Sequence, residues 1–158
     1  MKILVGFCSL SGNTKKMAEA IARGVKDEGV TCDLKEVSQI TVDELLNYEG
    51  LIFGSPTYYG LMTADLKRLF DDSVKHHGKL TGKIGGAFTS SGMMGGGGET
   101  TILSIFEALL IHGMIIAGDA KMQHYGPLAV GAPDNEAEKN CMKYGKKIAA
   151  LTKKIYGT

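Results

Sequence analysis

The chain has little that would support binding to nucleic acid or insertion into a membrane. Its 158 residues carry 18 basic and 17 acidic side chains, so a net charge of +1 provides no excess positive field for phosphate backbones. The longest apolar runs, such as Met114–Ala117, are far shorter than the about 18 residues that a membrane-spanning helix requires. We therefore expect no nucleic-acid partner and no membrane insertion.

Cysteine is scarce and tryptophan is missing. Cys8, Cys32 and Cys141 are odd in number and widely spaced, without a Cys-x-x-Cys pair, which is typical of free thiols in a reducing cytoplasm and does not indicate a metal site. Met1–Phe7 reads as a strand rather than as a secretory signal. A cytoplasmic protein without a metal centre is expected, and the role of each thiol stays open.

Short apolar runs alternate with segments of helical periodicity. Continuous apolar runs are typical of strands that are buried on both faces of a parallel sheet. The spacing of three and four residues between the runs indicates helices with one buried face. The expected strands are Ile3–Phe7, Thr31–Val37, Leu51–Gly54, Lys83–Thr89 and Met114–Ala117.

The expected helices follow each of these strands. After the second strand, Thr41–Glu44 matches a capping box and predicts a short helix, whereas residues 119–134 show no convincing period. The apolar residues that mark the helices are Met17, Ala18, Ile21, Ala22 and Val25, then Leu45 and Leu46, then Leu66, Leu69, Phe70 and Val74, then Ile102, Phe106, Leu109 and Leu110, and finally Met142, Ile148, Ala149 and Ile155.

Five strands alternating with five helices predict a doubly wound α/β fold with a five-stranded parallel sheet. The length fits a single domain over residues 1–158. Parallel neighbours need right-handed helical crossovers, which cover both faces of the sheet. Ligands of such folds bind beyond the carboxyl ends of the strands. The loops after the first, third and fourth strands are therefore the candidate binding loops.

The loop after the first strand is rich in hydroxyl groups and leads into a helix. Ser9, Ser11 and Thr14, with the free backbone amides of a helix amino terminus, can hold one phosphate. The loop matches neither GxGxxG nor GxxxxGK[ST], which disfavours a dinucleotide pyrophosphate site and a nucleotide triphosphatase. A simple turn with helix capping by Ser11 and Asn13 stays open as the alternative.

The other two loops supply a flat apolar surface and accessible backbone. Tyr58 and Tyr59 can stack on a planar ring, although one of them could instead cover the core. In residues 90–98, glycines let backbone groups approach a ligand and two methionines offer apolar contact, with a disordered tip as the alternative. A phosphate site, an aromatic loop and a glycine loop on one sheet edge predict FMN.

These loops also carry a resemblance to a known family. In order along the chain, Ser9–Thr14, Gly54–Leu69, Ser90–Met114 and Tyr125–Gly126 resemble the flavodoxin-like superfamily, most closely its WrbA-type NAD(P)H:quinone oxidoreductases. The third stretch is the most specific, because it combines the glycine loop, the helix start ETTI and the closing HGM. The resemblance implies the strand order 2-1-3-4-5, with FMN at the switch point of the sheet.

By this resemblance the first loop binds the FMN phosphate, the second flanks the flavin and the third lines its polar edge. His112 lies where the family has a flavin-contacting histidine at a subunit interface, which implies a homo-oligomer, either a dimer or a tetramer; from the residues alone it reads as a helix carboxyl-terminal cap. Tyr58 stands where the family usually has an arginine. The implied cofactor-binding residues are Ser9, Leu10, Ser11, Gly12, Asn13, Thr14, Pro56, Thr57, Tyr58, Tyr59, Gly60, Ser91, Gly92, Met93, Met94, Gly95, Gly96, Gly97 and His112.

The predicted function is electron transfer from NADH or NADPH through FMN to a quinone or similar small-molecule acceptor. The flavin supplies the chemistry, so no separate catalytic acid or base is required. The alternative is a flavodoxin-type carrier that docks with redox partner proteins; by the resemblance such carriers are strongly acidic, which steers docking. This chain is nearly neutral and residues 56–62 and 90–98 contain no carboxylate, which favours the enzyme and two-electron chemistry. A flavin-binding module without turnover is a third, weaker hypothesis.

Overall fold

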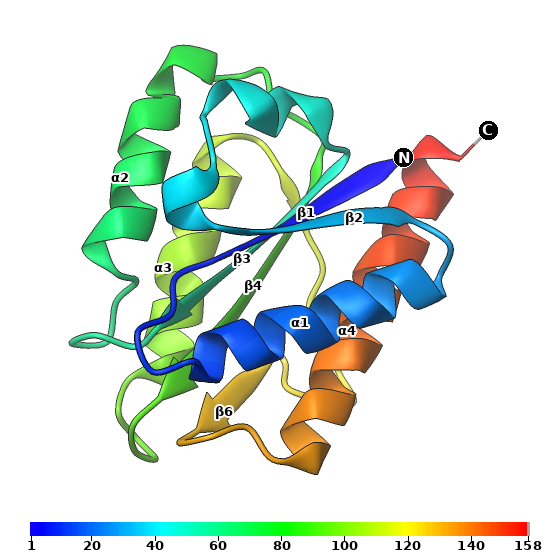
Figure 1. Cartoon of the computed structure of the whole chain (residues 1–158). Helices are drawn as coiled ribbons and strands as arrows, with labels where there is room; N and C mark the ends of the chain where they lie inside the picture. Colours follow the sequence, from blue (N-terminus) through cyan, green and yellow to red (C-terminus); the bar gives the residue numbers. More distant parts are fainter. Residues whose placement is uncertain (158) are drawn as a thin grey trace.

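The computed structural model describes residues 1–157 and contains one parallel sheet with helices on both faces (Figure 1). The strand order is β2-β1-β3-β4-β5, with β6 paired to β4, and every pair of these strands is parallel. This confirms the predicted doubly wound fold and its order. The strands are β1 (Lys2–Phe7), β2 (Thr31–Glu36), β3 (Gly50–Pro56), β4 (Ile84–Ser91), β5 (Ile115–Ile116) and β6 (Leu128–Val130).

The central strands β1, β3 and β4 are covered on both faces. All eight residues of β4 are buried, as are five of the six in β1 and six of the seven in β3. A strand in this position needs apolar or small side chains in both directions, which is why these segments read as unbroken runs without alternation.

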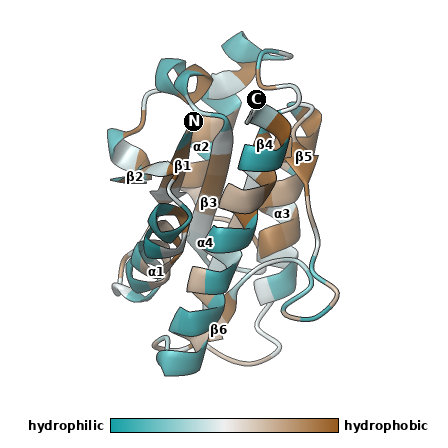
Figure 2. Ribbon diagram, turned by 90° about the vertical axis from the view of Figure 1, so that its right-hand side faces the viewer, coloured by the Kyte–Doolittle hydropathy of each residue, from teal (hydrophilic) through white to brown (hydrophobic). Residues whose placement is uncertain are grey.

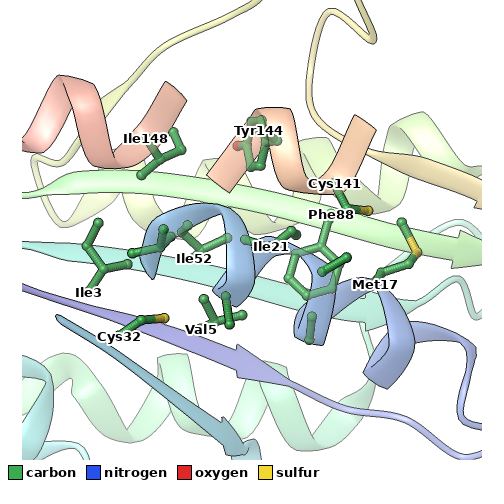
Figure 3. Packing of buried hydrophobic residues seen from close by; sticks show 14 of the residues in the cluster. Ile3, Val5, Met17, Ile21, Cys32, Ile52, Phe88, Cys141, Tyr144 and Ile148 are labelled. Carbon is green, nitrogen blue, oxygen red and sulfur yellow. The ribbon is translucent and has the colours of Figure 1, made fainter. Parts of the chain in front are cut away.

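Two pairs of helices cover the sheet. The pair α1 and α4 packs on one face, where Ile3, Val5 and Ile52 meet Met17 and Ile148 (Figure 3). The pair α2 and α3 covers the other face. None of the helices in residues 1–157 combines the length and the apolar character that crossing a bilayer requires. Their bounds are α1 Asn13–Asp27, α2 Ala64–Asp72, α3 Gly98–Ile111 and α4 Asn135–Tyr156.

The short helix predicted after the second strand is present as a 3-10 helix, without the predicted capping box. Residues 37–39 and 43–47 form only short 3-10 turns, and the residue before the second turn makes no side-chain capping bond. Thr41 accepts a bond from the Glu44 amide through its backbone carbonyl at 3.2 Å. The Glu44 carboxylate pairs with Lys35 Nζ at 3.0 Å. The capping box fails because its acidic partner is engaged by the neighbouring strand.

Three residues expected on buried helix faces are largely exposed. Val74 is 69% exposed, because α2 ends at Asp72 and the chain tightens into a 3-10 turn that buries Ser73 instead. Leu110 is 56% exposed and Ile155 is 44% exposed, near the ends of their helices. Figure 2 shows that α3 is hydrophobic over much of its length, so apolar character alone did not identify its buried side.

The fifth strand is interrupted, which the sequence interpretation missed. The two residues of β5 pair with Ile84 and Gly85, whereas β6 pairs with the carboxyl end of β4, and residues 117–127 leave the sheet between them. In the gap, the Ala87 amide donates to the hydroxyl of Tyr144 from α4 at 3.1 Å. A side chain therefore replaces the missing strand partner. The prediction of no regular element in residues 119–134 is wrong for β6.

The three cysteines are free thiols, as expected. Burial raises the pKa of Cys32 to about 11 and that of Cys141 to about 12, so both remain protonated at neutral pH. Cys8 is half-buried at the carboxyl end of β1, and burial also raises the pKa of its thiol.

Candidate functional site

Three loops meet beyond the carboxyl ends of the central strands, at the lower edge of the molecule in Figure 1. They follow β1, β3 and β4. A cavity of about 260 Å³ lies between them, and a second cavity of about 330 Å³ adjoins it. The two share Leu10, Pro56 and Tyr58. The first is also lined by Ser11, Asn13, Thr57, Ser90, Ser91 and Gly92, and the second by Cys8, Ser9, Thr63, Ala64 and Asp65.

The loop after β1 leads into a helix whose N-cap residue offers no side-chain cap. Gly12 occupies the N-cap position of α1 without a side-chain capping bond, and the first turn contains no acidic residue. Ser9 Oγ accepts hydrogen bonds from the amides of Gly12 and Lys15 at 3.2 Å each. The positive end of the α1 dipole thus faces the loop without a compensating charge from the first turn, which is a suitable environment for an anion.

Thr14 ties this loop to the sheet instead of facing outward. Its side chain is 1% exposed, and its hydroxyl lies 2.8 Å from the hydroxyl of Ser90 at the end of β4. The Thr14 hydroxyl is therefore already engaged, in contrast to the exposed Ser11 beside it. In this structure Thr14 fixes the position of the loop after β1.

The loop after β3 forms a tight turn that projects one tyrosine. The amides and carbonyls of Tyr58 and Leu61 exchange hydrogen bonds of 3.1 and 3.0 Å, and Tyr59 and Gly60 have φ values of 51° and 75°. Two positive φ angles are the signature of a type I′ turn. Among residues 1–157, Tyr59 is the one non-glycine residue with a positive φ angle, and its side chain is fully exposed. A bulky residue is strained there, and such strain is concentrated at ligand sites.

The second and third loops touch through glycines. A Cβ at Gly97, where φ is 91°, would lie 2.7 Å from the Cα of Gly60. The Thr100 hydroxyl donates to the Gly60 carbonyl at 2.8 Å, and the Thr57 amide donates to the Ser90 carbonyl at 2.8 Å. The glycine at position 97 is thus required by the close approach of the two backbones. Met93 and Met94 lie exposed on the rim of the third loop.

The structure brings together all the predicted cofactor residues except His112. This residue follows the carboxyl end of α3, whose 14 residues place it roughly 20 Å from the glycine loop at about 1.5 Å per residue. His112 therefore lies far from the three loops of its own chain. The resemblance to the family implies that such a histidine lies at a subunit interface. There it would contact the flavin of a neighbouring subunit.

The surroundings of His112 fix its neutral form. Ser73 donates its hydroxyl proton to the Phe70 carbonyl at 2.7 Å, so the His112 Nε2 that lies 2.7 Å from Ser73 Oγ must donate. The remaining Nδ1 is buried and has no partner among the described residues. Burial, followed by repulsion from His77 and His76, lowers the pKa of His112. Within this protomer it joins the end of α3 to the turn that follows α2, and its predicted cofactor role stays a prediction.

Sequence reasoning missed several residues that shape the site. Thr89 and Thr100 hold the second loop through hydroxyl groups: Thr89 Oγ1 lies 3.0 Å from Thr57 Oγ1, and Thr100 binds the Gly60 carbonyl. Asp65 and Cys8 line the second cavity. No periodic signal marks Thr89 or Asp65, whereas Thr100 belongs to the helix start ETTI that the sequence already indicates.

Comparison with known proteins gives consistent matches. A family model described as flavodoxin matches residues 5–108. A protein of Aquifex aeolicus named flavodoxin is 40% identical over 157 residues, covering 94% of this chain and 85% of its own. An Archaeoglobus fulgidus protein named NAD(P)H dehydrogenase (quinone) is 32% identical over 188 residues, covering 98% of both chains. The structure of a flavodoxin, WrbA-like protein from Agrobacterium tumefaciens superimposes with a TM-score of 0.85 at 24% identity, covering 98% of both chains. The predicted resemblance to the superfamily and to its WrbA branch is thereby confirmed.

Proposed function

The chain belongs to the flavodoxin family, and from this premise we propose that it is an FMN-binding oxidoreductase that passes electrons from NADH or NADPH to a quinone or similar acceptor. The observation that carries the proposal is that three loops suited to ligand binding meet at one edge of the sheet. The first leads into a helix end that favours an anion, the second projects the strained Tyr59, and the second and third are in backbone contact at Gly60 and Gly97. Of these features, the left-handed conformation of Tyr59 costs stability in the protein alone.

The residues present fit FMN. The amides at the start of α1 and the hydroxyls of Ser9 and Ser11 would hold a phosphate, because they place hydrogen-bond donors at the positive end of a helix dipole. Tyr58 and Tyr59 would flank a planar ring, and the backbone of residues 92–97 would approach its edge. When bound, FMN supplies a ring that accepts a hydride or single electrons and passes them on.

The chain's own contribution is positioning. The bonds of Thr14 to Ser90 and of Thr57 to Thr89 and Ser90 hold the first two loops against β4, so the ligand groups are aligned before anything binds. Preorganised donors of this kind stabilise charge without a reorganisation cost. No side chain of the three loops has to transfer a proton for electrons to pass to an acceptor.

The charge of the site edge favours an enzyme over a carrier. The second and third loops contain no carboxylate, and the whole chain has a net charge of +1. Negative charge gathered around a ring would oppose further negative charge on it. Apart from Asp65 in the adjoining cavity, the site contributes no such charge, which suits two-electron transfer to a small acceptor more than docking of a basic redox protein. Relatives named as quinone dehydrogenases support this direction.

A second candidate is an electron carrier that docks with redox partner proteins. It is favoured by the relative named flavodoxin and by the exposed Tyr59, Met93 and Met94 around the site, which would give a partner direct access. In either role we place the protein in the cytoplasm as a single domain, on the grounds of its three free thiols and its size. Assembly into a dimer or tetramer is part of the enzyme proposal.

The test is an FMN titration of purified apoprotein, followed by anaerobic addition of NADH or NADPH while the visible absorbance of oxidised flavin is recorded. The proposal expects stoichiometric binding, rapid bleaching and transfer to a soluble quinone. Tyr59→Ser should weaken FMN binding, whereas Tyr156→Ser, which removes another exposed tyrosine ring on α4, should not. Binding without bleaching would favour the carrier, and no binding would refute the assignment of the loops.

A further inference from the structure

The segment between β5 and β6 forms a closed loop of defined shape beside the glycine loop. The Asp119 amide donates to the His124 carbonyl at 3.0 Å, and His124 Nδ1 donates to the Asp119 carbonyl at 2.7 Å. Lys147 of α4 pairs with the Asp119 carboxylate at 3.1 Å. Figure 2 shows the two halves of the interrupted strand at opposite ends of the sheet edge, with this loop between them. The segment is therefore closed by the bonds between Asp119 and His124 and anchored to α4 by Lys147.

The same loop packs against the start of α3. The Gln123 amide group donates to the Leu128 carbonyl at 2.8 Å and accepts from the Leu128 amide at 2.9 Å. A Cβ at Gly98, the first residue of α3, would lie 2.2 Å from a methyl group of Leu128. Leu128, the first residue of β6 after this loop, thus reaches the residue that follows Gly97, at the same edge of the sheet as the proposed FMN site.

A third cavity, of about 220 Å³, lies between this loop and α3. Its apolar surface comes from Ile102, Met122 and Leu128, and the Tyr125 ring, 46% exposed, adds a flat face. A cavity of this size and lining suits a planar base packed against an aromatic ring.

The polar groups of the cavity are mainly hydrogen-bond acceptors. Glu99 lines it and forms no ion pair with any residue of the described chain. His124 uses Nδ1–H for the Asp119 carbonyl, which leaves Nε2 of the neutral ring as an acceptor. The Tyr125 hydroxyl can either donate or accept. The ligand that matches this set must bring its own donors.

The balance of donors and acceptors distinguishes the possible ligands. A quinone presents only acceptors, so Glu99 and His124 would remain unmet beside it. A ribose diol presents two O–H donors that one carboxylate can accept together, and such pairing is the usual way an acidic residue holds the 2′-hydroxyl of NAD. A 2′-phosphate in the same place would be repelled by the carboxylate and would find no lysine or arginine among the residues that line the cavity.

We propose that this cavity binds the adenosine half of NADH, with its base on Tyr125 and its ribose diol on Glu99, and that Glu99 makes the protein select NADH over NADPH. The inference rests on the proposed reductase function, since it names the electron donor of that site. Glu99 acts here as a specificity-determining residue and takes no part in the electron transfer itself.

The test compares Glu99→Gln with Glu107→Gln, which makes the same charge change on an exposed residue two turns further along α3. In the FMN-loaded protein, anaerobic bleaching should be at least about tenfold more efficient with NADH than with NADPH, as expected for a hydrogen bond to a charged group. Glu99→Gln should reduce that preference severalfold, Glu99→Lys should reverse it, and Glu107→Gln should leave it unchanged. Calorimetry with ADP-ribose, which carries no reducible ring, gives a second readout: its affinity should fall in Glu99→Gln and not in Glu107→Gln.

The outcomes separate the two proposals. Efficient reduction by NADPH, or a preference that is the same in all variants, would overturn the role of Glu99 while leaving the reductase function intact. Reduction by NADH without any binding of ADP-ribose would overturn the cavity assignment in the same way. Binding of ADP-ribose that depends on Glu99, with no bleaching by either nucleotide, would support the cavity and overturn the reductase.

Discussion

Replacing Gly97 by alanine should separate the second and third loops and weaken FMN binding. The new Cβ would lie 2.7 Å from the Cα of Gly60 and 3.2 Å from the hydroxyl of Thr100. The first of these contacts is with backbone, which cannot rotate away as a side chain can. Either residues 57–63 or residues 92–97 must move, and both belong to the proposed FMN site.

The size of the effect follows from two separate costs. A non-glycine residue at a φ of 91° loses about 1–2 kcal/mol for the left-handed conformation. Overpacking against fixed neighbours adds about 1–3 kcal/mol. Gly29 provides the matched control, because its φ is 74° but a Cβ there would meet nothing within 4 Å. Gly29→Ala should therefore show the first cost alone.

The assay is urea unfolding of the apoprotein together with FMN titration for each variant. Gly97→Ala should lose more of the free energy of unfolding than Gly29→Ala, and its dissociation constant for FMN should rise about tenfold or more, since each tenfold corresponds to about 1.4 kcal/mol. Gly29→Ala should bind FMN like the wild type. Equal FMN affinity in the two variants would show that contact between the loops is irrelevant to the site.

Two further predictions concern stability. Tyr144→Phe removes the hydroxyl that accepts from the Ala87 amide in the interrupted sheet edge, so it should cost about 1–3 kcal/mol, whereas Tyr156→Phe, at an exposed hydroxyl, should cost far less; equal melting temperatures of the two variants would contradict this. His112 has a pKa below its ordinary 6.5 in the folded chain, so the folded state binds this proton less readily than the unfolded state. The free energy of unfolding that depends on neutral His112 is fully present above pH 6.5 and is lost as the pH falls below that value. Urea unfolding between about pH 7 and pH 5.5 should therefore show a smaller loss of stability in His112→Gln than in the wild type. The exposed control His124→Gln should behave like the wild type.

The fold could be predicted from the sequence where burial alone determines structure. The segments around Leu51–Phe53 and Ile3–Val5 are apolar on both faces because they lie in the middle of the sheet. The split of the fifth strand could not be predicted in the same way. β6 has only three residues, and its pairing depends on Thr89 and its neighbours, about forty positions earlier in the chain.

The sequence predicts which loops form the site, but not how their side chains are oriented. A glycine at position 60 indicates a turn, but nothing in the sequence shows that Tyr59 takes the first left-handed position of that turn. The hydroxyl of Thr14 could point to a ligand or to the sheet, and only the position of Ser90 decides it. His112 was assigned by resemblance, and its distance from the loops depends on the direction of α3, which motif spacing does not report.

The interruption between β5 and β6 has a consequence for how this protein meets copies of itself. An unbroken outer strand offers a row of free amides and carbonyls onto which another chain can add, and this is a common start of aggregation. Here that border is reduced to stretches of two and three residues separated by a projecting loop. At the opposite border, β2 carries Asp33, Lys35 and Glu36, whose charges disfavour the same addition. Any assembly of this protein should therefore use its helices or loops rather than the borders of its sheet.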